Sequence, residues 1–477
     1  MNDLPPGWAE ASLGEIADTS LGKMLDRGKA TGKHTVPYLR NVNVQWGRID
    51  LDDVLTMEIP PEEQDFFKLE PRDLLVCEGG EVGRCAIWAG DAEYMAFQKA
   101  LHRVRPHAGI EVKYLRYLME YMSLSRMLVP YSTGSTIKHL SQQQLRRLPI
   151  VIPPTPEQCR IVAALEGLLS RLERGTEQVA KLIRRIDRFR DALMAAACTG
   201  RLKGDSYYDF AAVKLASADS IDGDLPDIPS HWSWARLSEI AEVVGGVTKD
   251  SKKQSDPALP EVPYLRVANV QRGRLDLANV SYIRVPPQKA RQLELRPGDV
   301  LLNEGGDRDK LGRGWIWEGQ IPGCIHQNHV FRARVLDSVL HPKLLAWHAN
   351  GFGKRWCEVN GKQSVNLASI SLAKIKMLPL PLPPIEEQKQ LVAEAEQYLT
   401  LLDNAERTAR ASLSRAYELR KSLLTEAFAG RLVEQDPADE PASVLLERIR
   451  AERVVQGPVR RTRRGKGEKA PQKETLL

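Results

Sequence analysis

Two long stretches of the chain carry apolar residues at the spacing of a heptad. In the first stretch the members of one row lie seven residues apart: Leu165, Leu172, Val179, Ile186 and Leu193. A second row lies three residues further on: Leu168, Leu182, Phe189 and Ala196. This spacing predicts an amphipathic helix whose two rows form the seam of a coiled coil.

The ends of this helix are also marked in the sequence. Thr155, Pro156 and Gln158 offer a capping hydroxyl, a proline at the first helical position and the side chain that completes a capping box. Gly200 is typical of the residue that follows a helix. The predicted helix has about 40 residues and is roughly 60 Å long.

The second stretch, from about Glu386 to Ala429, repeats the pattern with smaller residues. Its two rows are Ala395, Leu402, Ala409, Ala416 and Leu423, and Tyr398, Ala405, Ser412 and Leu419. Because large residues of one helix would face small residues of the other, we expect the helices to pair with each other, antiparallel. The expected core of this pair is Leu165, Leu172, Val179, Ile186, Leu193, Leu402, Leu419 and Leu423. The alternative is two unrelated helices, each covering its own domain.

The rest of the chain has short apolar runs between turns rich in glycine, proline and aspartate. Residues 74–76, 86–88 and 148–152 have the length of strands. One segment has helical spacing instead, with apolar residues at Tyr114, Leu115, Leu118, Met119, Met122 and Leu128. The expected fold class is α+β: two related α/β globular domains joined by two long helices, which form an antiparallel coiled coil with an internal pseudo two-fold.

The chain is a tandem duplication. Residues 36–54 (VPYLRNVNVQWGRIDLDDV) and 262–280 (VPYLRVANVQRGRLDLANV) are identical at 13 of 19 positions. The pair Glu157-Gln158 returns as Glu387-Gln388, and the offset then stays constant to the end of both helices. Since one inserted residue would rotate the rest of a paired helix by about 100°, we expect the helices to be spacers of fixed length.

These patterns divide the chain into seven segments. They are a first globular domain (1–155), a first spacer helix (156–200), a linker (201–228), a second globular domain (229–384), a second spacer helix (385–430), a C-terminal helical segment that packs near the repeat junction (431–456) and a basic tail (457–477).

The net charge of +6 comes almost entirely from the tail. The last 21 residues contain seven Arg and Lys against two Glu, so the rest of the chain is nearly neutral. Any nucleic-acid contact in the body therefore needs local clusters of positive charge. The tail has no apolar periodicity, and it is either a solvated, disordered segment or a non-specific contact with nucleic acid.

Cysteine usage and hydropathy point to a cytoplasmic protein. Six cysteines show no CxxC spacing, which favours a reducing compartment without a zinc site. The first residues, MNDLPPGW, are not those of a secretion signal, and no apolar run has the length of a membrane span.

No catalytic motif stands out. The sequence has no P-loop, no HExxH and none of the [DNS]PP[YFW] loops of amino-methyltransferases. Asp91, Glu111 and Lys113 only faintly resemble a nuclease motif, and the second copy has no counterpart. The repeated Glu-Gly-Gly at 78–80 and 304–306 is more typical of a tight turn than of an acid catalyst. We therefore expect recognition without catalysis, and no metal.

The two copies diverge in four loops that are rich in side chains suited to DNA. Arg and Lys read guanine, Asn and Gln read adenine, and Ser, Thr and Lys hold phosphates. The candidates of the first copy are Lys23, Arg27, Lys29, Lys33, His34, Gln98, Lys99, His102, Arg103, Ser132, Thr133, Ser135 and Lys138. Those of the second copy are Lys249, Lys252, Lys253, Arg308, Lys310, Gln327, Asn328, His329, Arg332, Lys362, Gln363, Ser364 and Asn366.

Other polar residues are shared by both copies. Arg40, Asn43, Gln45 and Arg48 return as Arg266, Asn269, Gln271 and Arg274. They suit either phosphate contacts or, as we favour, a hydrogen-bond network in a turn.

Four motifs resemble the specificity subunit of type I restriction-modification enzymes. They are GSTIKHLS (134–141), LPIVIPPTPEQ (148–158), LPLPLPPIEEQ (378–388) and AFAGRLVEQDPADEPASVLLERIRAER (427–453). Their order, with two variable domains each followed by a long helix, covers nearly the whole chain. In the second copy GKQSVNL replaces the GST pattern.

This resemblance implies two target-recognition domains, each reading one half of a split, asymmetric DNA sequence. It also implies binding to two methyltransferase subunits, which use S-adenosylmethionine to methylate adenine, and to ATP- and Mg-dependent restriction subunits that translocate and cleave DNA. The chain itself would need no cofactor. Two alternatives remain open: an enzyme with an unrecognised site, and a two-domain coiled-coil scaffold without DNA specificity.

Overall fold

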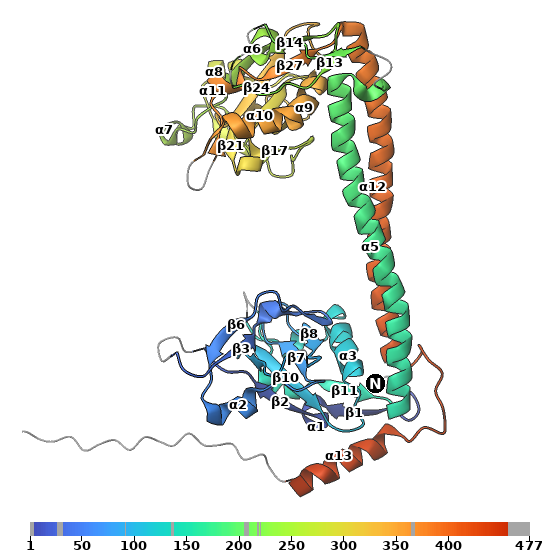
Figure 1. Cartoon of the computed structure of the whole chain (residues 1–477). Helices are drawn as coiled ribbons and strands as arrows, with labels where there is room; N and C mark the ends of the chain where they lie inside the picture. Colours follow the sequence, from blue (N-terminus) through green and yellow to red (C-terminus); the bar gives the residue numbers. More distant parts are fainter. Residues whose placement is uncertain are drawn as a thin grey trace, which may run out of the picture. The chain divides into compact units, whose positions relative to one another are not determined.

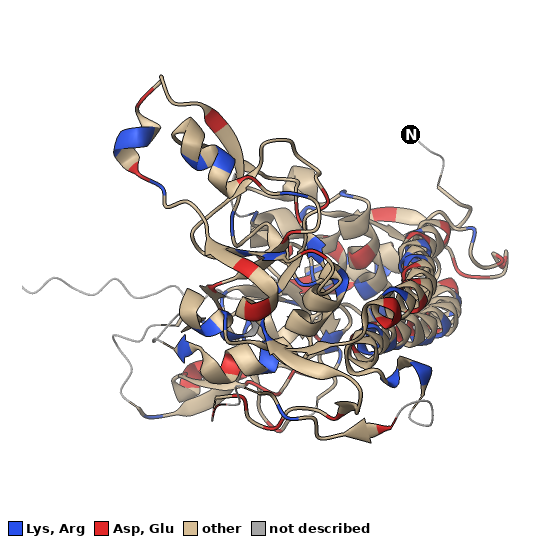
Figure 2. Cartoon of the chain, turned by 90° about the horizontal axis from the view of Figure 1, so that it is seen from above, with Lys and Arg blue, Asp and Glu red and all other residues tan. Residues whose placement is uncertain are grey.

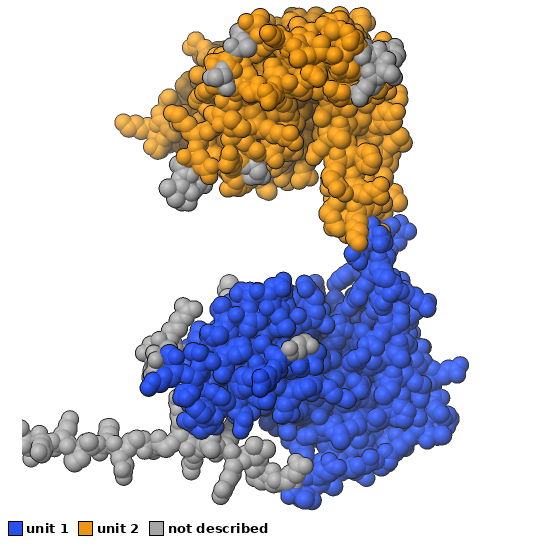
Figure 3. Space-filling view, in the orientation of Figure 1, with its two compact units in different colours: residues 1–178, 412–477 blue, residues 179–411 orange. Residues whose placement is uncertain are grey.

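The computed structural model describes residues 4–25, 32–90, 92–134, 138–204, 209–216, 219, 221–363 and 368–456. Two helices are far longer than all others described, α5 (Thr155–Thr199) and α12 (Ile385–Phe428). The chain forms two compact units, residues 1–178 with 412–477 and residues 179–411 (Figure 3). Each unit holds one globular α/β domain and part of both long helices (Figure 1). The predicted α+β class is confirmed.

The domain of unit 1 contains two main sheets. Its strands are β1 (Ala9–Ser12), β2 (Ala17–Leu21), β3 (Thr35–Leu39), β4 (Val44–Gln45), β5 (Arg48–Ile49), β6 (Leu55–Glu58), β7 (Leu74–Cys77), β8 (Cys85–Ile87), β9 (Ala96–Phe97), β10 (Leu101–Pro106) and β11 (Pro149–Ile152). Its helices are α1 (Leu13–Ile16), α2 (Pro61–Phe67), α3 (Val112–Leu124) and α4 (Gln142–Arg146). The sheets have the orders β2-β10-β7-β8 and β6-β3-β9, and β1 pairs with β11.

Unit 2 repeats this topology. Its strands are β12 (Phe210–Ala211), β13 (Ile228–Pro229), β14 (Ser233–Arg236), β15 (Ala241–Gly245), β16 (Glu261–Leu265), β17 (Val270–Gln271), β18 (Arg274–Leu275), β19 (Ser281–Arg284), β20 (Val300–Asn303), β21 (Gly305–Gly306), β22 (Gly314–Ile316), β23 (Ile325–His326), β24 (Val330–Val335), β25 (Lys362–Gln363), β26 (Ala368–Ser369) and β27 (Pro379–Leu382). Its helices are α6 (Leu237–Ile240), α7 (Ser251–Gln254), α8 (Pro287–Leu293), α9 (Pro342–Asn350), α10 (Phe352–Asn360) and α11 (Leu372–Ile375). The sheets β15-β24-β20-β22 and β19-β16-β23 correspond to the two main sheets of unit 1.

The core of each domain forms where apolar strands meet a helix. All four residues of β7 are buried, as expected of a strand covered on both faces. One face of α3, which includes Tyr114, Leu115 and Leu118, joins the main core of unit 1. This is the helix that the apolar spacing predicts, although it ends at Leu124 and buried Leu128 follows it.

The long helices pair in both units, and the pairing is antiparallel. In unit 1 the start of α5 shares a core with the end of α12, through Leu165 and Leu169 against Leu424 and Ala427. In unit 2 the end of α5, at Ala197, shares a core with the start of α12 at residues 392–395. Left-handed glycines, Gly200 and Gly430, follow the two helices (φ +78° and +70°), because a residue with a Cβ strains in that conformation.

The second row of the seam differs from the prediction. Leu165, Ile186, Ala395 and Ala409 of the first rows are buried, and Leu172, Val179, Leu193, Leu402 and Leu423 are half-buried. Most residues three further on are exposed, however, with Phe189 at 61% and Leu419 at 50%, while Ala196 and Ser412 are half-buried. The partly or fully buried second rows lie four residues on: Leu169, Thr176, Ile183, Arg190 and Ala197 on α5, and Leu399, Glu406, Leu413, Arg420 and Ala427 on α12. Leu419 is therefore not part of the core.

The predicted capping box at the start of α5 is also wrong. The Thr155 hydroxyl donates to the Gly109 carbonyl at 2.8 Å, and the Gln158 amide donates to Pro153 and Gly109. Gln158 also accepts a hydrogen bond from the Glu111 amide at 2.8 Å. These side chains fasten the helix to its domain instead of capping it.

The C-terminal segment folds back on the domain of unit 1. Helix α13 (Ala442–Gln456) places Leu445, Leu446 and Ile449 in the main core of this unit. The Arg453 guanidinium donates to the Gly14 and Glu15 carbonyls of α1. The basic tail, 457–477, lies outside the described residues.

Candidate nucleic-acid interface

The divergent loops of unit 1 meet at one edge of the larger sheet. Strand β10 runs antiparallel to both β2 and β7. The end of β2 at Leu21, the end of β7 at Cys77 and the start of β10 at Leu101 therefore lie at the same edge. We call four segments, 22–23, 78–80, 98–100 and 132–134 with 138–140, the loop edge of unit 1.

A series of backbone hydrogen bonds holds these four segments together. The Lys99 amide donates to the Lys23 carbonyl at 2.9 Å, and the Glu78 amide donates to Ala100 at 3.0 Å. The Leu140 amide donates to Glu78 at 2.7 Å. Each loop is thus tied to its neighbour without the use of a side chain.

Unit 2 contains the same series of bonds. The Asn328 amide donates to Val247 at 2.9 Å, Glu304 donates to His329 at 3.0 Å, and Ile370 donates to Glu304 at 2.8 Å. The loop edge of unit 2 comprises 246–249, 304–310, 327–329 and 362–363 with 368–370. Because main-chain atoms form the series, side chains at both edges can differ while the scaffold stays the same.

One glycine in each copy permits this close approach. A Cβ on Gly22 would lie 2.2 Å from the Phe97 carbonyl oxygen, and one on Gly246 would lie 2.0 Å from that of His326. Both distances are far below van der Waals contact. The sharp approach of this loop to the sheet edge therefore requires glycine in both domains.

The fourth loop forms a hairpin in both units despite its different sequence. Thr133 pairs with His139 and His139 with Gly79 in unit 1. In unit 2 β25 pairs with β26, which pairs with Gly305 and Gly306 of β21. Lys362 and Gln363 therefore take the place of Thr133 beside the Glu-Gly-Gly turn, while residues 364–367 lie outside the described part.

Many candidate side chains at the loop edges are exposed. In unit 1 these are Lys99, Thr133 and Lys138, with Ser132 and Gln98 half-buried and Lys33 and His34 exposed in the preceding segment. In unit 2 they are Lys249, Lys252, Lys253, Arg308, His329, Lys362 and Gln363, with Gln327 and Asn328 half-buried. Arg27, Lys29, Ser135, Ser364 and Asn366 lie outside the described residues.

Some of the candidate cationic side chains already lie close to acidic residues. Lys23 forms an ion pair with Glu63, and Lys310 forms one with Asp307. Lys253 lies 3.6 Å from Asp250, and the His329 ring is 2.6 Å from Glu304. A phosphate would have to compete with these carboxylates, which makes Lys99, Lys138 and Lys362 the stronger candidates.

Three candidates have structural roles that do not fit contact with DNA. His102 is fully buried, its Nε2 lies 2.7 Å from the Leu140 carbonyl, and burial lowers its pKa, which keeps the ring neutral. Arg103 donates to the carbonyls of Phe66 and Lys68 at the end of α2. Arg332, 2% exposed, donates to the Gln292 carbonyl and to Glu242. The two arginines brace equivalent helices, α2 and α8.

The polar residues shared by both copies do include a turn network. Asn43 is buried, accepts from the Arg40 amide and donates to the Asp50 and Asp53 carbonyls. Asn269 makes the same three bonds, with Arg266, Asp276 and Asn279. The network that we favoured from the sequence is confirmed for this pair of asparagines.

The sequence reasoning missed the residues that join each domain to its helix. The Trp8 indole donates to Glu157 at 3.1 Å, and Trp232 donates to Glu387 at 3.0 Å. Gln388 accepts from the His341 amide at 2.7 Å, as Gln158 does from Glu111. The signal was available, because both the tryptophans and the Glu-Gln pairs are repeated.

Burial shifts the pKa of several titratable groups among the described residues. All six cysteines are free, and burial raises the pKa of Cys324 and Cys357 to about 12. Burial also lowers the pKa of His326 and His348 to about 4. Among the described residues no group of three His, Cys, Asp or Glu could hold a metal ion, and no helix could cross a membrane.

Comparison with known proteins agrees with this two-domain architecture. Residues 5–182 match the family described as type I restriction modification DNA specificity domain. The chain is 25% identical over 485 residues to the type I restriction enzyme StySPI specificity subunit of Salmonella potsdam, covering 97% of this chain and 98% of that protein. It is 26% identical over 469 residues to the EcoBI specificity subunit of Escherichia coli, covering 96% and 94%.

A solved structure shares the fold. It was described under the heading "Structural basis underlying complex assembly and conformational transition of the type I R-M system", and its matching chain has a TM-score of 0.67. The identity is 18%, with 90% of this chain and 100% of that chain covered. The fold and the internal repeat define a protein of two related domains and two long helices. Residues 5–182 thus match the DNA specificity domain family, and the chain is similar over nearly its whole length to specificity subunits of type I restriction enzymes.

Proposed function

We propose that each domain reads one half of a split, asymmetric DNA sequence through its loop edge, with domain 1 at 1–155 and domain 2 at 229–384. The observation that carries this proposal is the repeated series of backbone bonds at the two edges. The bonds are alike, while the exposed side chains on them differ. A common scaffold with different side chains is what reading two unlike sequences requires.

The exposed residues of each edge divide into two kinds. Exposed lysines such as Lys99, Lys138 and Lys362 suit phosphates or guanine edges, and the half-buried amides of Gln98, Gln327 and Asn328 suit adenine. The body of the chain is nearly neutral. These local cations therefore supply the positive charge that DNA binding needs.

The helix pair holds the two reading domains apart by a set length. Residues 156–200 and 385–430 act as spacers, so that the number of unread base pairs between the half-sites depends on their length. The chain further binds two methyltransferase subunits that carry S-adenosylmethionine, and restriction subunits that use ATP and Mg. It contributes recognition and assembly, while the partner subunits supply the chemistry.

The proposal that each domain reads its own half-site is tested by exchanging residues 1–155 for the same part of a relative with a known target. The hybrid and the native chain are each assembled with the methyltransferase subunits, and methylated adenines are mapped along a genome. We expect one half of the methylated sequence to change and the other to stay. A change in both halves or in neither would contradict the proposal, and failure to bind DNA with the partner present would favour a protein-only scaffold.

A further inference from the structure

A buried carboxylate joins the domain of unit 1 to the long helices. Glu120 on α3 is 5% exposed. Its Oε1 accepts from Arg420 Nε of α12 at 2.6 Å, and its Oε2 lies 3.2 Å from Arg116 Nη2. Arg420 also donates to Glu173 of α5 at 3.0 Å. A single guanidinium thus contacts the domain and both long helices.

Aromatic packing strengthens the same junction. The Phe428 ring, at the end of α12, stacks on Tyr121 with centroids 5.2 Å apart and meets the edge of Tyr114 at 5.4 Å. Both tyrosines belong to α3, one turn on either side of Tyr117. Helix α3 is therefore held to α12 by a buried ion pair and by a three-ring cluster.

Unit 2 lacks both contacts at the equivalent positions. Asn350 stands where Glu120 stands in the first copy, and its amide bonds only to Gly314 and Ala346 of its own domain. Cys198 and Gly351 replace Phe428 and Tyr121. Cys198 is buried in the core of unit 2, and its thiol lies 3.6 Å from the Leu344 carbonyl, so no ring among the described residues of α12 or α5 stacks on α9 at this place.

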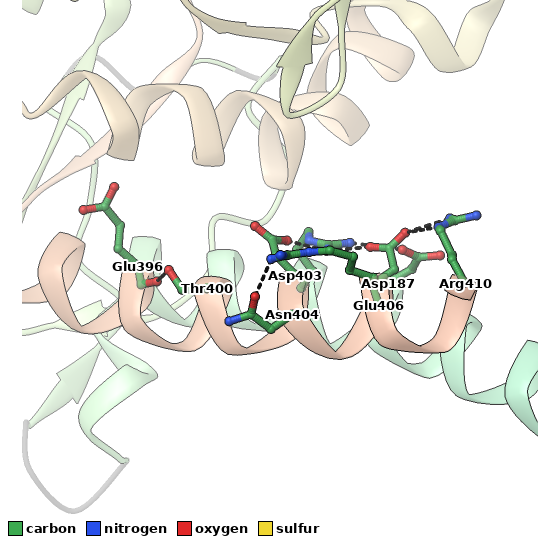
Figure 4. A network of polar contacts seen from close by, with 9 residues as sticks. Asp187, Glu396, Thr400, Asp403, Asn404, Glu406 and Arg410 are labelled. Atoms are coloured by element: carbon green, nitrogen blue, oxygen red, sulfur yellow. Dashed lines mark hydrogen bonds and ion pairs between the residues drawn. The ribbon is translucent and has the colours of Figure 1, made fainter. Parts of the chain in front are cut away.

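The arginine itself is retained in unit 2 but serves the helices alone. Arg190 is the counterpart of Arg420, and it forms ion pairs with Asp187, Asp403 and Glu406, all on α5 or α12 (Figure 4). The duplication therefore contains a matched pair of arginines. One joins a domain to the helices and the other joins only the two helices.

We propose that Glu120 is a positioning residue, which fixes the orientation of the first reading domain on the helix pair through Arg420. The second domain lacks this ion pair and the ring cluster, and although Lys343 pairs with Glu396 and Trp232 bonds to Glu387 of α12, we expect it to adjust its orientation more readily than the first. The effect that we infer on DNA recognition rests on the proposed function. A fixed first domain restricts the half-site spacings that the subunit accepts, since a domain that samples other orientations engages DNA at other spacings as well.

The test compares Glu120→Gln and Arg420→Gln with Arg190→Gln in the complete methyltransferase complex. The DNA pool keeps both half-sites and varies the gap between them by one base pair in either direction. We expect the first two variants to lower the preference for the native gap by roughly tenfold. Methylation at the native gap should stay close to that of the unchanged complex. Arg190→Gln should keep the native preference.

Unchanged gap preference in both Glu120→Gln and Arg420→Gln would overturn the proposal, as would an equal loss in Arg190→Gln. If Glu120→Gln does not fold, Arg420→Gln still decides, because it leaves Glu120 beside Arg116. Hydrogen exchange of the unchanged chain gives a second readout. Slower exchange at 420–428 than at 190–198 is expected, and equal exchange would count against the inference. A complex that methylates without regard to either half-site would instead refute the proposed function.

Discussion

Arg190 on α5 donates a hydrogen bond of 2.8 Å to Asp403 on α12. The duplication repeats this pair with the helices exchanged, because Arg420 on α12 donates to Glu173 on α5 at 3.0 Å. Each arginine occupies the second row of its seam, where an apolar residue is usual. An arginine there is favourable only opposite the acids of the partner helix, so the two pairs favour one register of the antiparallel helices.

The stability of the helix pair should depend on pH through Glu406. Hydrogen bonds from Arg190 and then Arg410 hold the pKa of Glu406 below its ordinary value of 4.5. A carboxyl with a lowered folded-state pKa stabilises the fold above its unfolded pKa, and this stability is lost as the pH falls through the folded value. We expect the melting temperature to fall below about pH 4.5, and Glu406→Gln to flatten this fall. Glu440→Gln, on an exposed pair, is the control, and an equal effect would contradict the assignment.

Exposed lysines at the loop edge of unit 1 should contribute to DNA affinity by charge. Replacing Lys99 and Lys138 with Ala should weaken binding and reduce the slope of log affinity against log salt by up to about 2, if each lysine contacts one phosphate. Fluorescence anisotropy of the complete complex on its target DNA measures both quantities. Lys421→Ala, on the exposed side of α12, should leave the slope unchanged. A slope equal to that of the native complex would exclude these lysines as phosphate contacts.

Arg332 and Lys362 should respond differently although both are candidates by sequence. Arg332 is buried and braces α8, so Arg332→Met should lower the free energy of unfolding by about 3 kcal/mol, because it strips carbonyl and carboxylate partners of their donor. Lys362 is exposed, so Lys362→Ala should change stability by less than about 0.5 kcal/mol and act on DNA affinity alone. Thermal melts and binding assays on both variants separate the effects. If Arg332→Met were stable but bound DNA more weakly, Arg332 would have to contact DNA directly, and its assignment as a structural residue would be wrong.

The first loop can approach the sheet edge this closely only if residue 22 has no side chain. Gly22→Ala places a Cβ against the Phe97 carbonyl and must move the loop that carries Lys23. We expect weaker binding and altered recognition of one half-site, with the other half-site read as before. Gly204→Ala is a useful comparison, since no atom lies within 4 Å of a Cβ there although its φ is positive. Normal recognition by Gly22→Ala would show that this approach is not needed.

Insertion of one heptad into both long helices should lengthen the unread gap. Seven residues preserve the seam and add about 10 Å, or roughly three base pairs at 3.4 Å each. The half-site sequences should not change. Insertion into α5 alone leaves part of one seam without its partner and should reduce activity at every gap. Methylation of DNA with graded gaps measures both outcomes, and an unchanged gap would show that the helices do not set the spacing.

The sequence alone determined the features that depend on local pattern or on self-comparison. Heptad spacing predicted the long helices, and the repeated residues predicted two domains of one topology. Repetition also identified the Asn43 network, because a side chain kept in both copies serves something common to both. These signals need no knowledge of which residues meet in space.

Only the tertiary structure decided which residues meet. Residues three and four positions beyond Leu165 both lie next to it on a helix, so the sequence does not show which of the two rows faces the partner helix. In the structure Arg190 faces Asp403 and Glu406 of α12, and Phe189 is exposed, although Phe189 is the more apolar of the two. The burial of His102 and Arg332 likewise depends on β10 and β24 lying at the centres of their sheets. A sequence shows that a side chain is polar and variable, but packing decides whether it faces water or a neighbouring carbonyl.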